Sequence, residues 1–174
     1  MKTILRFPLS SGQVGTDETI AVMRAVAIDA AESGRLTAAT ARRIRDDNQS
    51  AWMRMKDVYA FLHASVIYAD DAEGVEQIRT PERMLLDMQN AKDGKARGDC
   101  DDRATLGAAL LLAMGLPAYF IVVTSSPLRQ WHHVFYGSAL PDVPDRVIPF
   151  DPQENIPPGI WPAHHDRKAY PVRR

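Results

Sequence analysis

Apolar residues recur at helical spacing through the first third of the chain and predict three helices. A capping Thr16 followed by acidic residues indicates the start of the first helix, which is expected to end near Gly34. A second helical segment begins at Thr37, and a third is expected over residues 50–65. We therefore expect a helical region over residues 16–65. The apolar stripe of the first helix consists of Ile20, Met23, Ala27, Ile28 and Ala31.

A strongly apolar segment in the middle of the chain predicts a buried helix. Between Ala104 and Met114 only Thr105 is clearly polar, and a glycine and a proline follow closely. A helix that is apolar on all sides belongs in the interior of a domain. Before it, a short helix is expected over residues 80–88, and the polar segment 89–98 is expected to be a loop.

Strand patterns dominate the last third of the chain. Ten of the twelve prolines lie from Pro117 onward, which disfavours helices there. Three β-rich segments separated by turn residues predict a short antiparallel sheet, over 118–124, 132–137 and 146–151, and a brief strand is expected to begin at Val66. We therefore expect an α+β fold in which the buried helix packs on this sheet. The 174 residues fit one domain, with a core over about 66–153 and a proline-rich tail over 154–174.

Composition and charge exclude several classes of protein. Hydrophobic residues make up 45% and charged residues 25%, which is typical of a folded chain. The 21 basic and 22 acidic residues give a net charge of −1, which argues against nucleic-acid and membrane-surface binding. No apolar run approaches the roughly 20 residues that cross a bilayer. The first residues, interrupted by Arg6 and Pro8, make a poor signal peptide, so a cytoplasmic location is expected.

The single cysteine, Cys100, is the first candidate for chemistry. One cysteine excludes an intrachain disulfide and any multi-cysteine metal site. Cys100 lies where a loop meets the predicted buried helix, and free N–H groups and the helix dipole stabilise a thiolate there. Its acidic neighbours Asp99, Asp101 and Asp102 would oppose a thiolate if they pointed towards it, so we expect Asp101 and Asp102 to cap the helix or bind neighbouring loops. The alternative is an inert, buried thiol.

A nucleophilic thiol needs a base and an acceptor that orients the base. His132 and His133 begin a predicted strand, so their rings point to opposite faces and only one of them can face Cys100. His133 shares its face with Phe135. Asp151 ends the last predicted strand and could accept a hydrogen bond from His133.

These residues together resemble the transglutaminase-like superfamily, most closely its bacterial and phage-type cysteine proteases. The shared pattern is Gly-Asp-Cys-Asp-Asp, a helix that ends in Ala-Met-Gly-Leu-Pro-Ala, and then His-Val-Phe-Tyr and Phe-Asp-Pro in the same order. The resemblance implies a papain-like α+β fold in which Cys100 is the nucleophile, His133 the general base and acid, and Asp151 the residue that orients the imidazole. It also implies Gln77 as an oxyanion donor, although Gln77 equally fits a solvated loop residue. His132 is the alternative base.

The resemblance implies an enzyme that acts on amide bonds of peptides or proteins through a thioester, without a cofactor. We expect hydrolysis, as in a cysteine peptidase or amidase, because a small single domain offers little to exclude water. Transglutamination is the first alternative, and a phage-related assembly protein without activity is the second. A third is a metal site built from the pairs His132-His133 and His164-His165 with Asp151 and Asp166, although adjacent strand histidines diverge. The sequence does not predict an oligomeric state.

Overall fold

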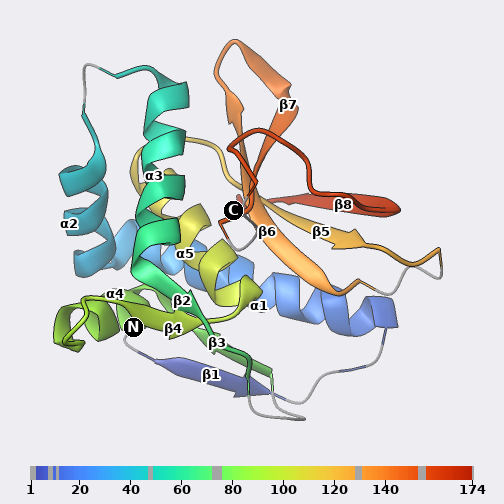
Figure 1. Cartoon of the computed structure of the whole chain (residues 1–174), viewed down its shortest axis with the longest axis horizontal. Coiled ribbons are helices and arrows are strands. Elements are labelled where there is room, and N and C mark those ends of the chain that lie inside the picture. Colours follow the sequence, from blue (N-terminus) through green and yellow to red (C-terminus); the bar gives the residue numbers. More distant parts are fainter. Residues whose placement is uncertain are drawn as a thin grey trace.

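The computed structural model describes residues 3–7, 10, 12–46, 49–71, 76–127, 131–152 and 156–173. Its order of elements is helical first and strand-rich last, and the predicted α+β class is confirmed (Figure 1). The helices are α1 (Gly12–Ser33), α2 (Arg35–Ile44), α3 (Ala51–Ser65), α4 (Pro81–Asn90) and α5 (Cys100–Ala113). The strands are β1 (Ile4–Phe7), β2 (Val66–Tyr68), β3 (Glu76–Arg79), β4 (Ala96–Gly98), β5 (Tyr119–Thr124), β6 (His133–Leu140), β7 (Val143–Phe150) and β8 (Asp166–Pro171).

Helix α5 lies at the centre of the fold, as its apolar sequence predicts. It packs against α1, α2, α3 and α4 on its helical side and against β6 of the sheet (Figure 1). The residues from Asp101 to Leu111 are all buried. Gly107 allows the close approach to the sheet, because a Cβ at this position would lie 2.5 Å from Cδ1 of Tyr136. The buried helix therefore has contacts on all sides, and its first residue emerges at the edge of the core.

The main sheet has four antiparallel strands in the order β7-β6-β5-β8. Tyr136 of β6 pairs with Phe150 of β7, and their rings stack with centroids 5.7 Å apart. Continuing this register places Asp151 opposite Phe135, on the same face as His133 and diagonal to it. The pairing of β6 with β7 thus brings a histidine and an aspartate together from positions 18 residues apart.

Two small sheets position the loop that leads to α5. β2 pairs with β4 in parallel, with Tyr68 opposite Gly98, so β4 delivers the chain directly to Asp99 and Cys100. Gly98 is needed at this point because a Cβ would lie 2.6 Å from an oxygen of Asp102. β1 pairs with β3 antiparallel, with Arg6 opposite Gln77.

Several helix boundaries agree with the predictions. Ser50 caps α3 by accepting a hydrogen bond from the backbone N–H of Met53. Thr80 caps α4 in the same way, with Pro81 in the first turn. The first helix differs from its prediction: α1 begins at Gly12, and Thr16 lies inside it, donating its hydroxyl to the carbonyl of Gly12. A threonine whose hydroxyl donates to a carbonyl of the preceding helical turn cannot be told from a capping threonine by sequence alone.

The predicted loop over 89–98 is wrong at both ends, because α4 continues to Asn90 and residues 96–98 form β4. A three-residue strand that is held by a distant partner leaves almost no periodicity to detect. β8 likewise lies within residues 154–174, for which the sequence predicted no strand. Residues 153–155 and 174 of this region lie outside the described residues.

Candidate active site

Cys100 is the first residue of α5, and its thiol is half-buried. The preceding residue, Asp99, caps the helix by accepting a hydrogen bond from the backbone N–H of Asp102 at 3.3 Å. Cys100 therefore lies in the first turn of a buried helix, where the helix dipole favours negative charge. This is the environment that the sequence predicts for Cys100.

His133 and Asp151 form a buried pair. Nε2 of His133 lies 2.7 Å from Oδ2 of Asp151, and the two side chains are 13% and 1% exposed. His133 also lies beside Cys100, since both residues line the same small hollow with Asp151. Since Asp151 occupies Nε2, Nδ1 is the ring nitrogen left for the thiol. The structure thus brings together all three residues of the predicted triad, in the order Cys100, His133, Asp151.

The protonation of His133 follows from two opposed effects. Burial lowers the pKa of the imidazole, but the hydrogen bonds and negative charges of Asp151 and Cys100 outweigh burial and raise the pKa to about 10. The ring is therefore an imidazolium at neutral pH. An imidazolium between a carboxylate and a sulfur stabilises the thiolate form of that sulfur.

His132, the alternative base, lines the pockets beside Cys100, but its side chain pairs with Ser125 and not with Asp151. Its side chain is exposed, and Nε2 lies 3.4 Å from the hydroxyl of Ser125. The strand alternation that separates His132 from His133 is the reason, because β6 directs only one of the two rings towards Asp151.

Gln77 lies on β3, is 7% exposed, and is not among the described residues that line the pockets around Cys100. Its side-chain oxygen accepts a hydrogen bond from Nε of Arg6 at 3.0 Å, and its backbone N–H donates to Asp71. The β1–β3 register therefore gives Gln77 a buried, bonded position, not that of a solvated loop residue. A role in binding an oxyanion stays a prediction.

Two of the acidic neighbours of Cys100 point into the protein. Asp102 is fully buried and accepts hydrogen bonds from the backbone N–H and the guanidinium of Arg79. Burial and the charge of Asp99 raise the pKa of Asp102 to about 7, against the opposing effect of Arg79. Burial and the neighbouring carboxyl group of Asp99 raise the pKa of Asp101 well above its usual range. As the sequence predicts for Asp102, its carboxylate binds a neighbouring element and not the thiol.

Among the described residues, the group of side chains suited to a metal ion is acidic. Asp99, Asp101 and Asp102 each offer an oxygen within 4.8 Å of the others. The predicted metal hypothesis, with His132-His133 and His164-His165, finds no such grouping in the part of the chain that the structure describes.

Arg103 is a buried residue of the site that the sequence analysis missed. It is 6% exposed, and its guanidinium donates to the backbone carbonyls of Val66 at 2.5 Å and Pro152 at 2.9 Å. Arg103 also lines a small hollow with Cys100, His133 and Asp151. One signal was available: Arg103 is the single basic residue in the sequence of α5, three positions after the cysteine.

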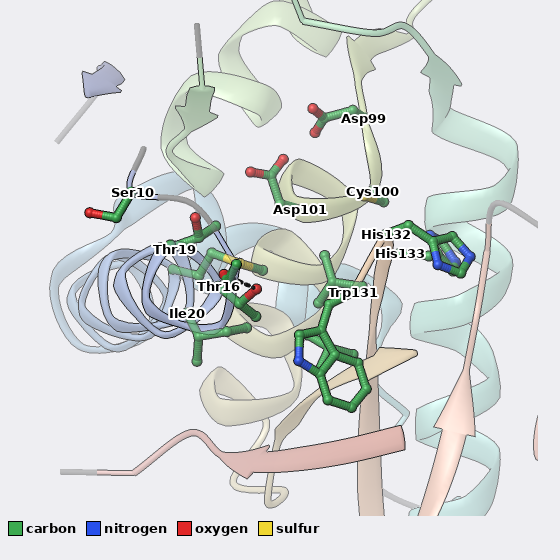
Figure 2. Close-up of a pocket in the computed structure, with 15 residues that line it drawn as sticks. Ser10, Thr16, Thr19, Ile20, Asp99, Cys100, Asp101, Trp131, His132 and His133 are labelled. Atoms are coloured by element: carbon green, nitrogen blue, oxygen red, sulfur yellow. Dashed lines mark hydrogen bonds between the residues drawn. The ribbon is translucent and has the colours of Figure 1, made fainter. Parts of the chain in front are cut away.

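Two pockets flank Cys100 and His133. One, of about 450 Å³, lies between α1, the start of α5 and the segment before β6 (Figure 2). The other, of about 420 Å³, is lined by Tyr68, Ser125 and the segment around Pro162. Because both pockets contact Cys100 and His133, a chain-like substrate can lie across the thiol with a part on each side.

Comparison with known proteins identifies two similar solved structures. A putative cysteine protease from Cytophaga hutchinsonii is 16% identical to this chain with a TM-score of 0.51, over 69% of this chain and 37% of that protein. The similarity is one of fold. A putative protease from Parabacteroides distasonis is 14% identical with a TM-score of 0.45, over 70% of this chain and 25% of that protein.

This chain therefore spans well under half the length of the structures that it resembles. No protein-family model and no curated protein matches the sequence. None of the described helices is both long enough and apolar enough to cross a membrane.

Proposed function

We propose that this protein is a thiol enzyme of the transglutaminase-like superfamily that hydrolyses amide bonds, as a cysteine peptidase or amidase. One observation carries the proposal: Cys100 at the start of a buried helix lines one hollow with His133, whose Nε2 lies 2.7 Å from the buried carboxylate of Asp151. The fold shared with a putative cysteine protease supports the same function.

The proposed reaction has two halves. The thiolate of Cys100 attacks the amide carbonyl carbon, a C–S bond forms, and the C–N bond breaks as His133 gives its proton to the leaving amine. Water then attacks the thioester, with neutral His133 accepting its proton, and the carboxylic acid leaves as the C–S bond breaks. Asp151 holds the imidazole in position and stabilises its charged form in both halves.

The oxyanion of each tetrahedral intermediate needs hydrogen-bond donors. The backbone N–H groups at the start of α5 lie beside the thiol and are proposed as donors. The family resemblance implies Gln77 as a side-chain donor. Its Oε1 accepts the hydrogen bond from Arg6, so the amide N–H₂ group would be the part of Gln77 that donates to the oxyanion.

Hydrolysis is favoured over transfer to an amine by the exposure of the site. Cys100 is only half-buried and has a pocket on each side, so water can reach a thioester formed there. Transglutamination would use the same thioester with an amine in place of water. A panel of peptide amides, assayed with and without an added primary amine, separates the two: free carboxylate is expected as the main product in both conditions.

Alkylation of Cys100 by iodoacetamide across pH tests the proposed chemistry. A thiolate paired with an imidazolium reacts well below the pH at which free cysteine does, so we expect Cys100 to react on the order of a hundredfold faster than free cysteine at pH 6. His133→Ala should lower this rate towards that of free cysteine. The exposed His63 on α3 provides the control, and His63→Ala should react like wild type.

Two results would contradict the proposal. One is an alkylation rate equal to that of free cysteine throughout the pH range. The other is an unchanged rate in His133→Ala with a large loss in His132→Ala, which would transfer the role of base to His132.

A further inference from the structure

The pocket of about 450 Å³ beside Cys100 combines an apolar part with an acidic wall (Figure 2). Ile20, Met23 and Val122 contribute the apolar part, while Asp99 and Asp101 line it next to the thiol. Thr19 adds a hydroxyl from α1. No lysine or arginine is among the described residues that line this pocket.

Asp99 and Asp101, which form the acidic wall, have no lysine or arginine beside them among the described residues that line the pocket. Asp101 is 3% exposed, and its Oδ2 has no hydrogen-bond partner among the described residues. Asp99 lies beside it, and burial together with this neighbour raises the pKa of Asp101 well above its usual range. The nearby guanidinium of Arg79 is directed at Asp102 and Asp71 instead. A buried carboxylate oxygen without a donor is destabilising, so a ligand that supplies donors is favoured.

The pocket on the other side of the thiol is different. It shares His132 and His133 with the first pocket, and its described lining adds Tyr68 and Ser125 but no carboxylate, lysine or arginine. The two halves of the groove therefore differ in charge, and only the α1 side favours a cation.

We propose that the pocket between α1 and Cys100 receives a cationic side chain of the substrate, an ammonium or guanidinium on a short apolar stem. The inference rests on the proposed function, since it places this side chain next to the amide that Cys100 attacks. The stem packs against Ile20, Met23 and Val122, and the cation donates charge-assisted hydrogen bonds to Asp99 and Asp101. A neutral side chain of the same length leaves the Oδ2 oxygen of Asp101 unpaired, and an acidic one is repelled.

Two matched alkylating agents test this assignment. N-(4-aminobutyl)chloroacetamide and N-(4-hydroxybutyl)chloroacetamide have the same reactive group and arms of the same length, and differ in charge. Second-order rate constants for Cys100 are measured at pH 7 in EDTA, and their ratio is divided by the ratio for free cysteine. This corrected ratio cancels any change in the reactivity of the thiol itself. We expect a value of about 10 for the wild-type protein.

Variants locate the source of the preference. Asp99→Asn keeps a capping side chain at the start of α5, and Asp101→Asn keeps the shape of the buried carboxyl; each should bring the corrected ratio close to 1. Asp142→Asn, on the exposed turn between β6 and β7, should retain the wild-type ratio. Thr19→Lys places a cation at the half-buried wall of the pocket and should also abolish the preference, which covers the case in which an Asn variant does not fold.

The outcomes separate this inference from the proposed function. Rapid labelling by iodoacetamide with a corrected ratio near 1 overturns the cation pocket and leaves the thiol enzyme standing. Slow labelling by iodoacetamide with a corrected ratio near 10 overturns the thiol enzyme and leaves the cation pocket standing. A ratio that stays high in both Asn variants overturns the assignment to Asp99 and Asp101. A preference that appears only when Ca²⁺ or Mg²⁺ replaces EDTA also overturns it, because the carboxylates would then be binding the metal.

Discussion

At the scale of single residues, the buried pair of His133 and Asp151 links the chemistry of the site to stability. Burial of the imidazole opposes its charge, and the carboxylate and the thiol restore it. A histidine whose pKa is higher in the folded than in the unfolded chain stabilises the fold below its unfolded pKa of about 6.5. This stabilisation is lost as the pH rises towards the folded value of about 10.

Asp151→Asn should therefore lower the melting temperature most near pH 6. The difference from wild type should shrink steadily as the pH approaches 10, because neutral His133 no longer needs the carboxylate. Thermal unfolding followed by circular dichroism between pH 5.5 and 10 measures it. Asp166→Asn, at the partly exposed start of β8, serves as the control. A deficit that grows with pH would contradict the raised pKa of His133.

The sequence predicts which residues gather around Cys100 better than it predicts the hydrogen bonds that hold the site in place. A helix start, strand alternation and a strand end are local patterns that make Cys100, His133 and Asp151 candidates, and the family resemblance selects His133 over His132. The hydrogen bonds of Arg103 to the carbonyls of Val66 and Pro152 cannot be predicted from local patterns, because both partners are backbone atoms of distant segments. The hydrogen bond between Gln77 and Arg6 depends on a pairing of strands about 70 residues apart.

At the scale of elements, the position of α5 depends on how closely it approaches β6. Gly107 faces the fully buried ring of Tyr136, and a methyl group there would lie 2.5 Å from the ring. Such close packing costs typically about 1–3 kcal/mol, while alanine in place of glycine favours a helix by about 1 kcal/mol. The ring cannot move into solvent, so the packing cost decides.

Gly107→Ala should destabilise the protein by up to about 2 kcal/mol, the surplus of overpacking over helix propensity. Urea denaturation gives the free energy of unfolding. The double variant with Tyr136→Leu should lose less than the two single changes together, since the smaller side chain makes room for the methyl group. A single variant more stable than wild type would mean that α5 and β6 are not in close contact at this point.

Long, strongly patterned elements are predicted well from this sequence, and short ones are not. α3, α5 and the strands β5, β6 and β7 follow from periodicity and turn residues. β1, β3 and β4 have three or four residues each, and their pairing partners lie far away in the chain. Such strands form because the tertiary structure places a pairing strand beside them, and their own sequences contain little that predicts this pairing.

At the scale of the whole molecule, helical and sheet portions meet at the site, and Arg103 joins them. From α5 it reaches the carbonyl of Val66 in β2 and that of Pro152, directly after Asp151. Other contacts tie α1 to the strand-rich part of the chain: Trp131 donates to Gln13 of α1 at 2.7 Å, and Tyr170 of β8 donates to Asp17. The position of Asp151 relative to Cys100 thus depends on bonds between separate layers.

Arg103→Lys should lower both stability and the reactivity of Cys100. A single ammonium cannot replace the planar fork that serves two carbonyls, and one buried carbonyl without a donor costs about 1–3 kcal/mol. The free energy of unfolding and the iodoacetamide rate at pH 6 are the two measurements. Arg97→Lys, at an exposed side chain, should change neither. Equal stability with wild-type alkylation would show that Arg103 does not position the site.

The hairpin of β6 and β7 also has a consequence for the order in which the site forms. These strands are joined by a two-residue turn, so His133 and Asp151 can meet through contacts that are local in the chain. Cys100 belongs to α5, which must dock on the sheet before its thiol reaches the imidazole. His133 and Asp151 can therefore come together in a partly folded chain, whereas Cys100 joins them only once α5 has docked. On the proposed function, the thiol of a partly folded chain therefore has the reactivity of an ordinary cysteine.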